Sequence, residues 1–243
     1  MSFDVGRAGS VAVFAATDWS MIAAAAQSGS STPRDALVRL CSSYWFPLYA
    51  YLRRKGHSTH DAEDLLQQFF ATRVLTRKVL IGVRPGVGRF RSWLLTCLRN
   101  MVANELERAE QRVRRKHALI DLDAAELRYN EELADASTPD TAYDRGCIAG
   151  AIERVRVALR EEYDASERGA WFEQLEGYLP GARSTRPYDE IAAHMHVEDN
   201  RVRSEVNKLR RRCGERLYAE IRRTVHNPSE AKQELEYLLG LLE

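Results

Sequence analysis

This sequence of 243 residues has no long apolar run and almost no net charge. Met21–Ala26, an apolar run that no other in the sequence exceeds, is far shorter than the roughly 18 residues that a membrane span needs. The amino terminus has no basic segment followed by an apolar one, the pattern that directs secretion. With 44% apolar and 29% charged residues, the composition also excludes a disordered chain. We therefore expect one or two globular domains in the cytoplasm, with no membrane partner.

Cysteine and histidine patterns typical of metal sites are also missing. The cysteines are widely spaced, with no CxxC pair and no His/Cys cluster, at Cys41, Cys97, Cys147 and Cys213. We expect them to be small buried apolar residues in a reducing compartment, rather than disulfides or zinc ligands. The pairs His57/His60 and His194/His196 have no carboxylate or cysteine partners at useful spacing, so we predict no metal site.

Motifs for catalysis are equally absent. The glycine-rich segment Gly82–Arg89 lacks the G-x-x-x-x-G-K-[ST] pattern of phosphate loops and follows no convincing buried strand. The sequence contains neither a G-x-S-x-G elbow nor an H-E-x-x-H helix. We therefore expect a protein that is not an enzyme and has no cofactor.

The net charge of +1 argues at first against a nucleic-acid partner, but the charge is divided along the chain. Nine basic and three acidic residues give Arg201–Arg223 a charge of +6, and Arg99–Lys116 has six basic and three acidic residues, or +3. Asp121–Asp144 has eight acids and one arginine, or −7, and the tail from Asn227 has four acids and one lysine, or −3. The basic segments are either solvated helix faces or two separate anion-binding surfaces.

The apolar residues recur with helical spacing almost throughout, and Val79–Val83 is the only weak strand candidate. Two early helices are expected, one from Pro33 toward Arg54 and stopped by Gly56, and one from Ser58 or Thr59 to Val74. Further helices are expected over Phe90–Arg115, Tyr143–Tyr163, Ser166–Leu179, Tyr188–His196 and Asp199–Thr224, with a tail helix opened by Asn227-Pro228-Ser229-Glu230.

The segment Tyr188–Arg212 reads as a short helix, a tight turn and a longer basic helix. This is the pattern of a helix-turn-helix, whose second helix enters the DNA major groove. One face of the second helix is apolar, with Val202, Val206, Leu209 and Cys213, and another is polar, with Arg201, Ser204, Lys208 and Arg211. An ordinary amphipathic helical hairpin is the alternative, but the long side chains on the early turns favour DNA recognition.

The helix from Phe90 to Arg115 has a similar division. Its aromatic stripe faces away from a polar row formed by Asn100, Asn104, Arg108 and Arg115. Amides can bond exposed base edges and arginines can hold phosphates, which suits unpaired DNA. A solvated face is an equally good interpretation of this row alone.

Three motifs, in a fixed order along the chain, resemble those of a known family. They are Asp61–Phe70 (DAEDLLQQFF), Phe90–Asn100 (FRSWLLTCLRN) and the helix-turn-helix segment. Together they resemble bacterial sigma-70-family sigma factors, more narrowly the extracytoplasmic-function (ECF) group and a subgroup found in planctomycetes. The likeness runs from about Asp18 to the end of the chain and includes Tyr44–Arg54 and the Asn227–Leu242 tail.

The resemblance implies an all-α fold with two helical domains joined by an acidic linker. The implied parts are an amino-terminal segment (1–32), sigma region 2 (33–117), the linker (118–142), sigma region 4 (143–226) and a carboxy-terminal amphipathic helix (227–243). The implied partners are core RNA polymerase, through its β′ clamp and β subunits, and promoter DNA. The sequence leaves open whether an anti-sigma factor or another regulatory protein also binds.

The resemblance also assigns residues to three binding tasks. Core polymerase binding falls to Asp61, Asp64, Gln67 and Gln68. Recognition and melting of the −10 element falls to Arg84, Arg89, Asn100, Asn104, Arg108 and Arg115, while Phe90 and Trp93 support the helix from the core. Recognition of the −35 element falls to Arg201, Arg203, Ser204, Asn207, Lys208 and Arg211.

The implied function is promoter recognition and DNA melting in transcription initiation, without catalysis. The runner-up is a stand-alone helix-turn-helix regulator that binds duplex DNA without polymerase. Two departures from the family pattern concern promoter choice. The turn Glu198–Val202 replaces a usual Gly-Ala before Val, and Asn207-Lys208 stands where His-Arg is common. The promoter sequence therefore cannot be transferred from relatives.

Overall fold

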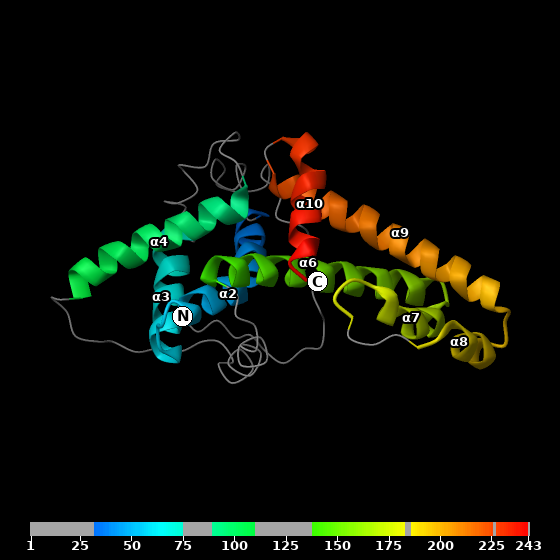
Figure 1. The fold of residues 1–243 in the computed structure, drawn as a ribbon. Helices are drawn as coiled ribbons and strands as arrows, with labels where there is room; N and C mark the ends of the chain where they lie inside the picture. The colour runs from blue at the N-terminus through cyan, green and yellow to red at the C-terminus, as the bar shows by residue number, and fades with distance from the viewer. Residues whose placement is uncertain (1–31, 75–88, 110–137, 183–185, 226, 243) are drawn as a thin grey trace.

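The computed structural model describes residues 32–74, 89–109, 138–182, 186–225 and 227–242, and every regular element within these ranges is helical (Figure 1). The expected all-α class therefore holds for the described residues. The amino-terminal segment, the weak strand candidate Val79–Val83 and most of the expected acidic linker lie outside them.

The amino-terminal half contains α2 (Thr32–Arg54), α3 (Thr59–Phe69) and α4 (Phe90–Ala109). Gly56 follows α2 with a φ of 92°, a left-handed conformation that glycine adopts without strain. The Ser58 Oγ then accepts a hydrogen bond from the Asp61 amide at 3.2 Å and so caps α3. The helix expected to run to Val74 instead widens after Phe69 into a π-helix over Phe70–Val74.

These three helices enclose an aromatic core. Tyr44 and Phe90 meet edge to face with ring centroids 5.4 Å apart, and Trp45 stacks on Tyr49 at 5.0 Å. Such ring pairs add about 0.5–1.5 kcal/mol beyond the area they bury. The largest completely buried members of this first core are Leu48, Tyr49, Leu66, Phe69, Phe90, Leu94, Leu98 and, from the helix α6 described below, Tyr143.

The carboxy-terminal half contains α6 (Pro139–Ala165), α7 (Gly169–Leu175), α8 (Tyr188–Met195) and α9 (Asp199–Thr224). The bounds of α9 are those that the sequence predicts. By contrast, α6 begins four residues before the expected Tyr143, because the Thr138 Oγ accepts from the Thr141 amide at 3.2 Å and Pro139 opens the first turn.

The helix expected over Ser166–Leu179 is shorter than predicted. Glu167 has a φ of 56°, which separates α6 from α7, and α7 passes into a 3-10 turn over Glu176–Tyr178. Likewise α8 ends at Met195, one residue early, because His196 adopts the left-handed conformation with a φ of 54°.

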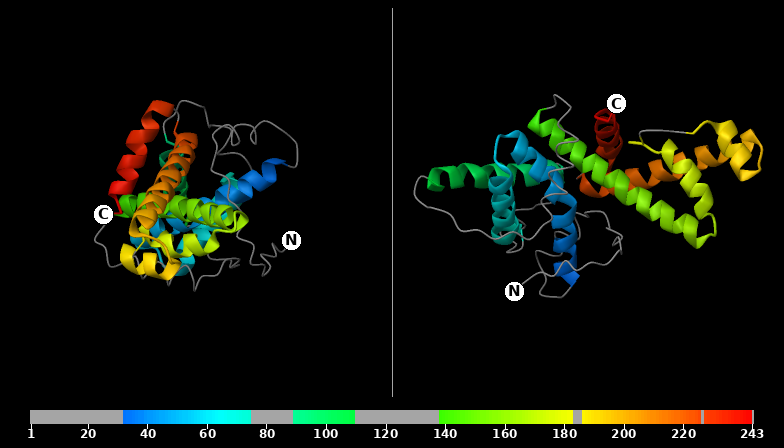
Figure 2. Two further views of the ribbon diagram at one scale, coloured as in Figure 1. Left: turned by 90° about the vertical axis from the view of Figure 1, so that its right-hand side faces the viewer. Right: turned by 90° about the horizontal axis from the view of Figure 1, so that it is seen from below.

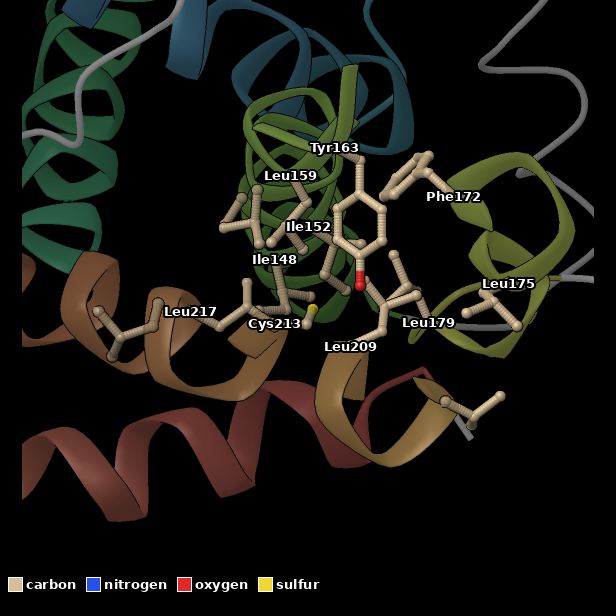
Figure 3. Packing of buried hydrophobic residues seen from close by; sticks show 14 of the residues in the cluster. Ile148, Ile152, Leu159, Tyr163, Phe172, Leu175, Leu179, Leu209, Cys213 and Leu217 are labelled. Atoms are coloured by element: carbon tan, nitrogen blue, oxygen red, sulfur yellow. The ribbon is translucent and has the colours of Figure 1, made fainter. Parts of the chain in front are cut away.

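The second core lies between α6, α7 and α9 (Figure 3). Tyr163 of α6 packs against Phe172 of α7 with ring centroids 5.6 Å apart. Leu159 lies beside the Tyr163 ring, and Ile148, Leu209 and Cys213 converge below it from α6 and α9. The apolar face predicted for α9 is thus confirmed, since Val202, Val206, Leu209 and Cys213 are all buried.

The long helix α6 joins the two cores. Its Tyr143 belongs to the first core and its residues from Ile148 onward to the second. Next to this boundary α6 lies directly on α2, where a Cβ on Gly146 would come within 3.2 Å of the Pro47 Cα. Figure 1 and the two views of Figure 2 show α6 running between the α2–α4 half and the α7–α9 half.

The tail forms a 3-10 turn over Pro228–Glu230 and then α10 (Ala231–Gly240), which packs against α9 and α6. As the sequence predicts, Asn227 starts this segment, because its Oδ1 accepts from the Ser229 amide at 3.1 Å. Viewed from the side or from below, α10 stands near the middle of the molecule (Figures 1 and 2).

The last two acids of the Asp121–Asp144 run differ from the expectation of a solvated acidic connector. Both Asp140 and Asp144 lie in α6, where they form ion pairs with Arg99 and Arg91 of α4. The side chain of Asp144 is buried, so its charge acts inside the fold. Asp144 falls within the helix expected over Tyr143–Tyr163, whereas Asp140 falls in the additional first turn that follows the Thr138 cap.

Candidate nucleic-acid and polymerase interface

The first candidate surface is the outer face of α3. Asp61, Asp64 and Gln68 are exposed on it, whereas Ala62 and Leu66 on the opposite face are buried in the first core. The backbone of this surface is therefore fixed by packing, and its polar groups point toward solvent. A rigid acidic and amide surface of this kind suits a partner with basic and hydrogen-bonding groups.

Two of the four predicted polymerase-binding side chains also have partners within α3. The Ser58 hydroxyl donates to the Asp61 carboxylate at 2.6 Å, next to the capping bond described above. The Gln67 Nε2 donates to Oε1 of the buried Glu63 at 2.8 Å. Asp64 and Gln68 are therefore the members of the set best placed to meet another protein.

The second candidate surface lies on α4. Phe90, Leu94 and Leu98 are completely buried, while Asn100 and Asn104 are exposed. The half-buried Trp93 packs against Phe90 with ring centroids 5.5 Å apart. Of the remaining predicted −10 residues, Arg84 and Arg115 lie outside the described residues, and Arg108 lies in α4 with its side chain outside them.

The last predicted −10 residue, Arg89, has a carboxylate partner that the sequence does not reveal. Its Nε lies 2.7 Å from Oε2 of Glu234, which comes from α10 near the end of the chain. The next arginine, Arg91, is buried and bonds the same carboxylate. One carboxylate of the tail helix therefore pairs with both arginines at the start of α4, of which Arg91 is buried and Arg89 stays partly exposed.

The third candidate surface begins at the turn between α8 and α9. The left-handed His196 reverses the chain, and the Val197 amide donates to the Ala192 carbonyl at 3.0 Å. After this turn the early turns of α9 present an exposed polar face. All six predicted −35 residues are exposed on it, namely Arg201, Arg203, Ser204, Asn207, Lys208 and Arg211.

Aromatic rings support several arginines of α9, a feature that patterning along the sequence does not reveal. The guanidinium of Arg201 lies 5.7 Å from the ring centroid of Trp171, and that of Arg203 lies 5.2 Å from that of Tyr188. Tyr188 in turn stacks on Tyr178 at 5.0 Å. Such contacts restrict the guanidinium while leaving its N–H groups available.

Acidic partners reduce the free positive charge of α9. The buried Glu205 accepts from Arg168 at 2.5 Å and from Lys208 at 3.0 Å. Burial raises the pKa of Glu205, but the two hydrogen bonds and their charges outweigh it, so the pKa lies below its ordinary value. Lys208 is thus held beside an ionised carboxylate.

The later arginines of α9 pair with the helix that lies beside it. Arg212 and Arg216 both bond Glu162 of α6, the second at 2.7 Å. The charge of +6 counted along Arg201–Arg223 is therefore uneven in space. On the first turns of α9, where the predicted −35 residues lie, Arg201 and Arg203 contact aromatic rings, and Arg222 and Arg223 are exposed in the last turn.

The cysteines make no disulfide, and the described residues hold no cluster of three or more metal-ligating side chains. Cys213 is buried as expected, but Cys41, Cys97 and Cys147 are only half-buried. Burial raises the pKa of Cys213 to about 11 and, against a backbone hydrogen bond, that of Cys41 to about 12. In the part of the chain that the structure describes, no helix is long and apolar enough to span a bilayer.

Comparison with known proteins identifies the domain that holds the first two surfaces. Residues 42–112 match the family model described as Sigma-70 region 2, and this range contains α3, α4 and both of their motifs. No curated protein and no solved structure matches the chain. The family is not enzymatic, and its members bind core RNA polymerase and promoters. Residues 42–112 of the chain therefore form a sigma-70 region 2 domain, a domain of the sigma factors that act in transcription initiation.

Proposed function

We propose that this chain is an ECF-type sigma factor that joins core RNA polymerase to promoters through two DNA-binding regions. The match to region 2 carries the proposal, and the second basic surface on α9 supports it. In this scheme residues 33–117 act as region 2 and 143–226 as region 4, with 118–142 as linker, after the segment 1–32 and before the tail helix 227–243. The ECF group and planctomycete-like subgroup belong to the same proposal.

The proposed polymerase contact is the outer face of α3. Asp61, Asp64, Gln67 and Gln68 would meet the β′ clamp, with further contact to the β subunit. The support is the exposure of Asp64 and Gln68 on a helix whose opposite face is completely buried. A preformed surface loses little conformational entropy on binding, which favours a stable complex.

The proposed −10 contact is the outer face of α4. Asn100 and Asn104 would bond the edges of unpaired bases, and Arg84, Arg89, Arg108 and Arg115 would hold phosphates. Capture of unpaired bases offsets the few kcal/mol that unstacking costs, so binding itself favours strand opening. The exposure of both asparagines on a helix whose other face, with Phe90, Leu94 and Leu98, is buried supports this arrangement.

The proposed −35 contact is a helix-turn-helix formed by α8 and α9. Arg201, Arg203 and their exposed neighbours would enter the major groove, where one bidentate arginine–guanine contact supplies about 1–3 kcal/mol of discrimination. The tight turn at His196 and the buried apolar face of α9 support this geometry.

Run-off transcription with purified core polymerase tests the function directly. The wild-type chain should support initiation, and the double variant Asp64→Ala, Gln68→Ala should bind core about tenfold more weakly, a change of about 1.4 kcal/mol. His60→Ala, an exposed change on the same helix, is the matched control. Specific binding to duplex DNA with no core binding would instead support the stand-alone regulator.

A further inference from the structure

The tail helix α10 reaches the amino terminus of α4 through one buried carboxylate. Glu234 is 1% exposed, and its Oε1 accepts from the Arg91 Nε at 2.8 Å. Its Oε2 lies 2.7 Å from the Arg89 Nε, as an ion pair without a well-directed hydrogen bond. One residue of the tail therefore binds two arginines that are 143 and 145 positions away in the sequence.

A second carboxylate closes the cluster around Arg91. Asp144 of α6 bonds the Arg91 Nη1, and the Tyr237 hydroxyl donates to Asp144 Oδ2 at 3.0 Å. The Arg91 guanidinium also lies 5.7 Å from the Tyr237 ring centroid. Burial lowers the pKa of Arg91. The hydrogen bond to Glu234 and the two carboxylate charges raise this pKa by more than burial lowers it, so Arg91 remains ionised.

The helices meet around this cluster with little free space. A cavity of about 30 Å³ lies between Tyr44, Arg91, Cys147, Ile221 and Leu238, which come from α2, α4, α6, α9 and α10. The half-buried Cys147 also packs against the first core. Its thiol therefore lies at the point where the two halves of the molecule join.

We infer that α10 is an intramolecular latch: Glu234 and Tyr237 hold α4 against α6 and keep Arg89 and Arg91 away from DNA. A carboxylate beside the arginines competes with the phosphate that Arg89 would bind, and it repels any phosphate that approaches. Partial opening is unfavourable, because removing one partner leaves a buried charge unpaired. The latch therefore opens as a unit. The inhibitory role of α10 rests on the proposed DNA binding, whereas its role in closing the junction between the two halves of the molecule does not.

Thiol labelling tests whether α10 closes the junction. In Glu234→Gln and in Tyr237→Phe, N-ethylmaleimide should label Cys147 several-fold faster than in the wild type, as measured by peptide mass spectrometry. Tyr237→Phe changes no charge and removes only the hydroxyl bonded to Asp144. Glu236→Gln is the matched control, since Glu236 is exposed on the same helix. An unchanged rate at Cys147 in both latch variants overturns the latch.

The same experiment reports whether a variant has lost its fold. Cys213 lies in the second core and away from the cluster, so its labelling should stay slow in every folded variant. If Glu234→Gln also speeds the labelling of Cys213, that variant has lost its fold. Tyr237→Phe then tests the latch, because the ring at position 237 still covers Arg91. Faster labelling of Cys147 alone in Tyr237→Phe supports the latch, and equal labelling of Cys147 in that variant and the wild type overturns it.

Fluorescence anisotropy with a labelled single strand tests inhibition. A single-stranded oligonucleotide carrying a −10-like sequence should bind free Glu234→Gln about tenfold more tightly than free wild type or Glu236→Gln. Faster Cys147 labelling without tighter DNA binding overturns the inhibitory role. If no variant binds DNA, with or without core polymerase, the proposed function fails, while the labelling comparison still decides whether α10 closes the junction.

Discussion

Glu205 illustrates how a single residue links the stability of α9 to its charge. It is buried under the candidate −35 surface and accepts hydrogen bonds from Arg168 and Lys208. Hydropathy patterning cannot find such a residue, because a glutamate on a basic helix looks like one more solvated charge. Only the fold brings Arg168, which is 37 positions away, to its carboxylate.

We predict that Glu205→Gln lowers the free energy of unfolding at neutral pH by about 1 kcal/mol, because the ion pairs are lost while both cations stay partly solvated. The loss should depend on pH. The folded pKa lies below the ordinary value near 4.5, so the stabilisation is present above that value and disappears as pH falls through the folded pKa. The free energies of unfolding of wild type and variant should therefore converge at acid pH.

Urea unfolding at pH 7 and at successively lower pH measures this difference. Glu215→Gln is the control, because Glu215 and Arg211 form an exposed pair 3.7 Å apart on the same helix. This control should change stability little at any pH. A difference in the free energy of unfolding between Glu205→Gln and wild type that stays constant down to the lowest pH would contradict the role given to the Glu205 ion pairs.

Among the elements, helix α9 is the one best predicted from sequence, and α6 is among the least well predicted. Two consistent faces define α9 over its whole length, so patterning finds both its bounds and its buried side. The start of α6 has a threonine cap and a proline, yet these lie at the end of an acidic stretch that composition assigns to a linker. Local capping prevailed there over average composition.

The exposed residues of the candidate site were predicted from sequence, but their supports were not. Periodicity places Arg201 on a polar face and the family resemblance adds Arg203, and both are exposed in the structure. The rings beneath them, Trp171 and Tyr188, come from α7 and α8 and meet α9 only through tertiary packing. The Glu234–Arg91 contact, across 143 positions, has no local signal at all.

The ring of Tyr188, which lies on α8, offers a test of the candidate −35 surface on α9. Tyr188→Leu keeps apolar bulk on α8 but removes the aromatic surface beside Arg203, so binding to a −35 duplex should weaken about threefold. Tyr188→Phe keeps the ring and should bind like the wild type. Fluorescence anisotropy at fixed salt measures both. Equal weakening in the two variants would assign the effect to the hydroxyl instead of the ring.

At the scale of the whole molecule, one helix, α6, contributes side chains to both cores. The amino-terminal turns of α6 cover the first core beside α2, and the rest of α6 forms a wall of the second. If either half unfolded alone, the apolar side of α6 would be exposed to water. We therefore expect the two halves to unfold together, with coincident transitions by circular dichroism and by tryptophan fluorescence.

The contact between Gly146 and Pro47 is the place to disturb this coupling. A side chain at Gly146 meets the backbone of α2, since a Cβ there lies 3.2 Å from the Pro47 Cα. Gly150, one turn later on α6, faces only the flexible end of Arg154, at 3.4 Å. Gly146→Val should therefore cost about 1–3 kcal/mol more than Gly150→Val, although both changes alter helix propensity equally.

Urea unfolding of the two valine variants measures that difference, and the fluorescence transition shows where it arises. In a Trp171→Phe background the described tryptophans that remain, Trp45 and Trp93, report on the first core. Because Gly146→Val forces α2 and α6 apart, its fluorescence transition should separate from the transition by circular dichroism, while Gly150→Val keeps them together. Equal stabilities and coincident transitions in both variants would mean that the contact between Gly146 and Pro47 does not couple the halves, and that other contacts of α6 hold them together.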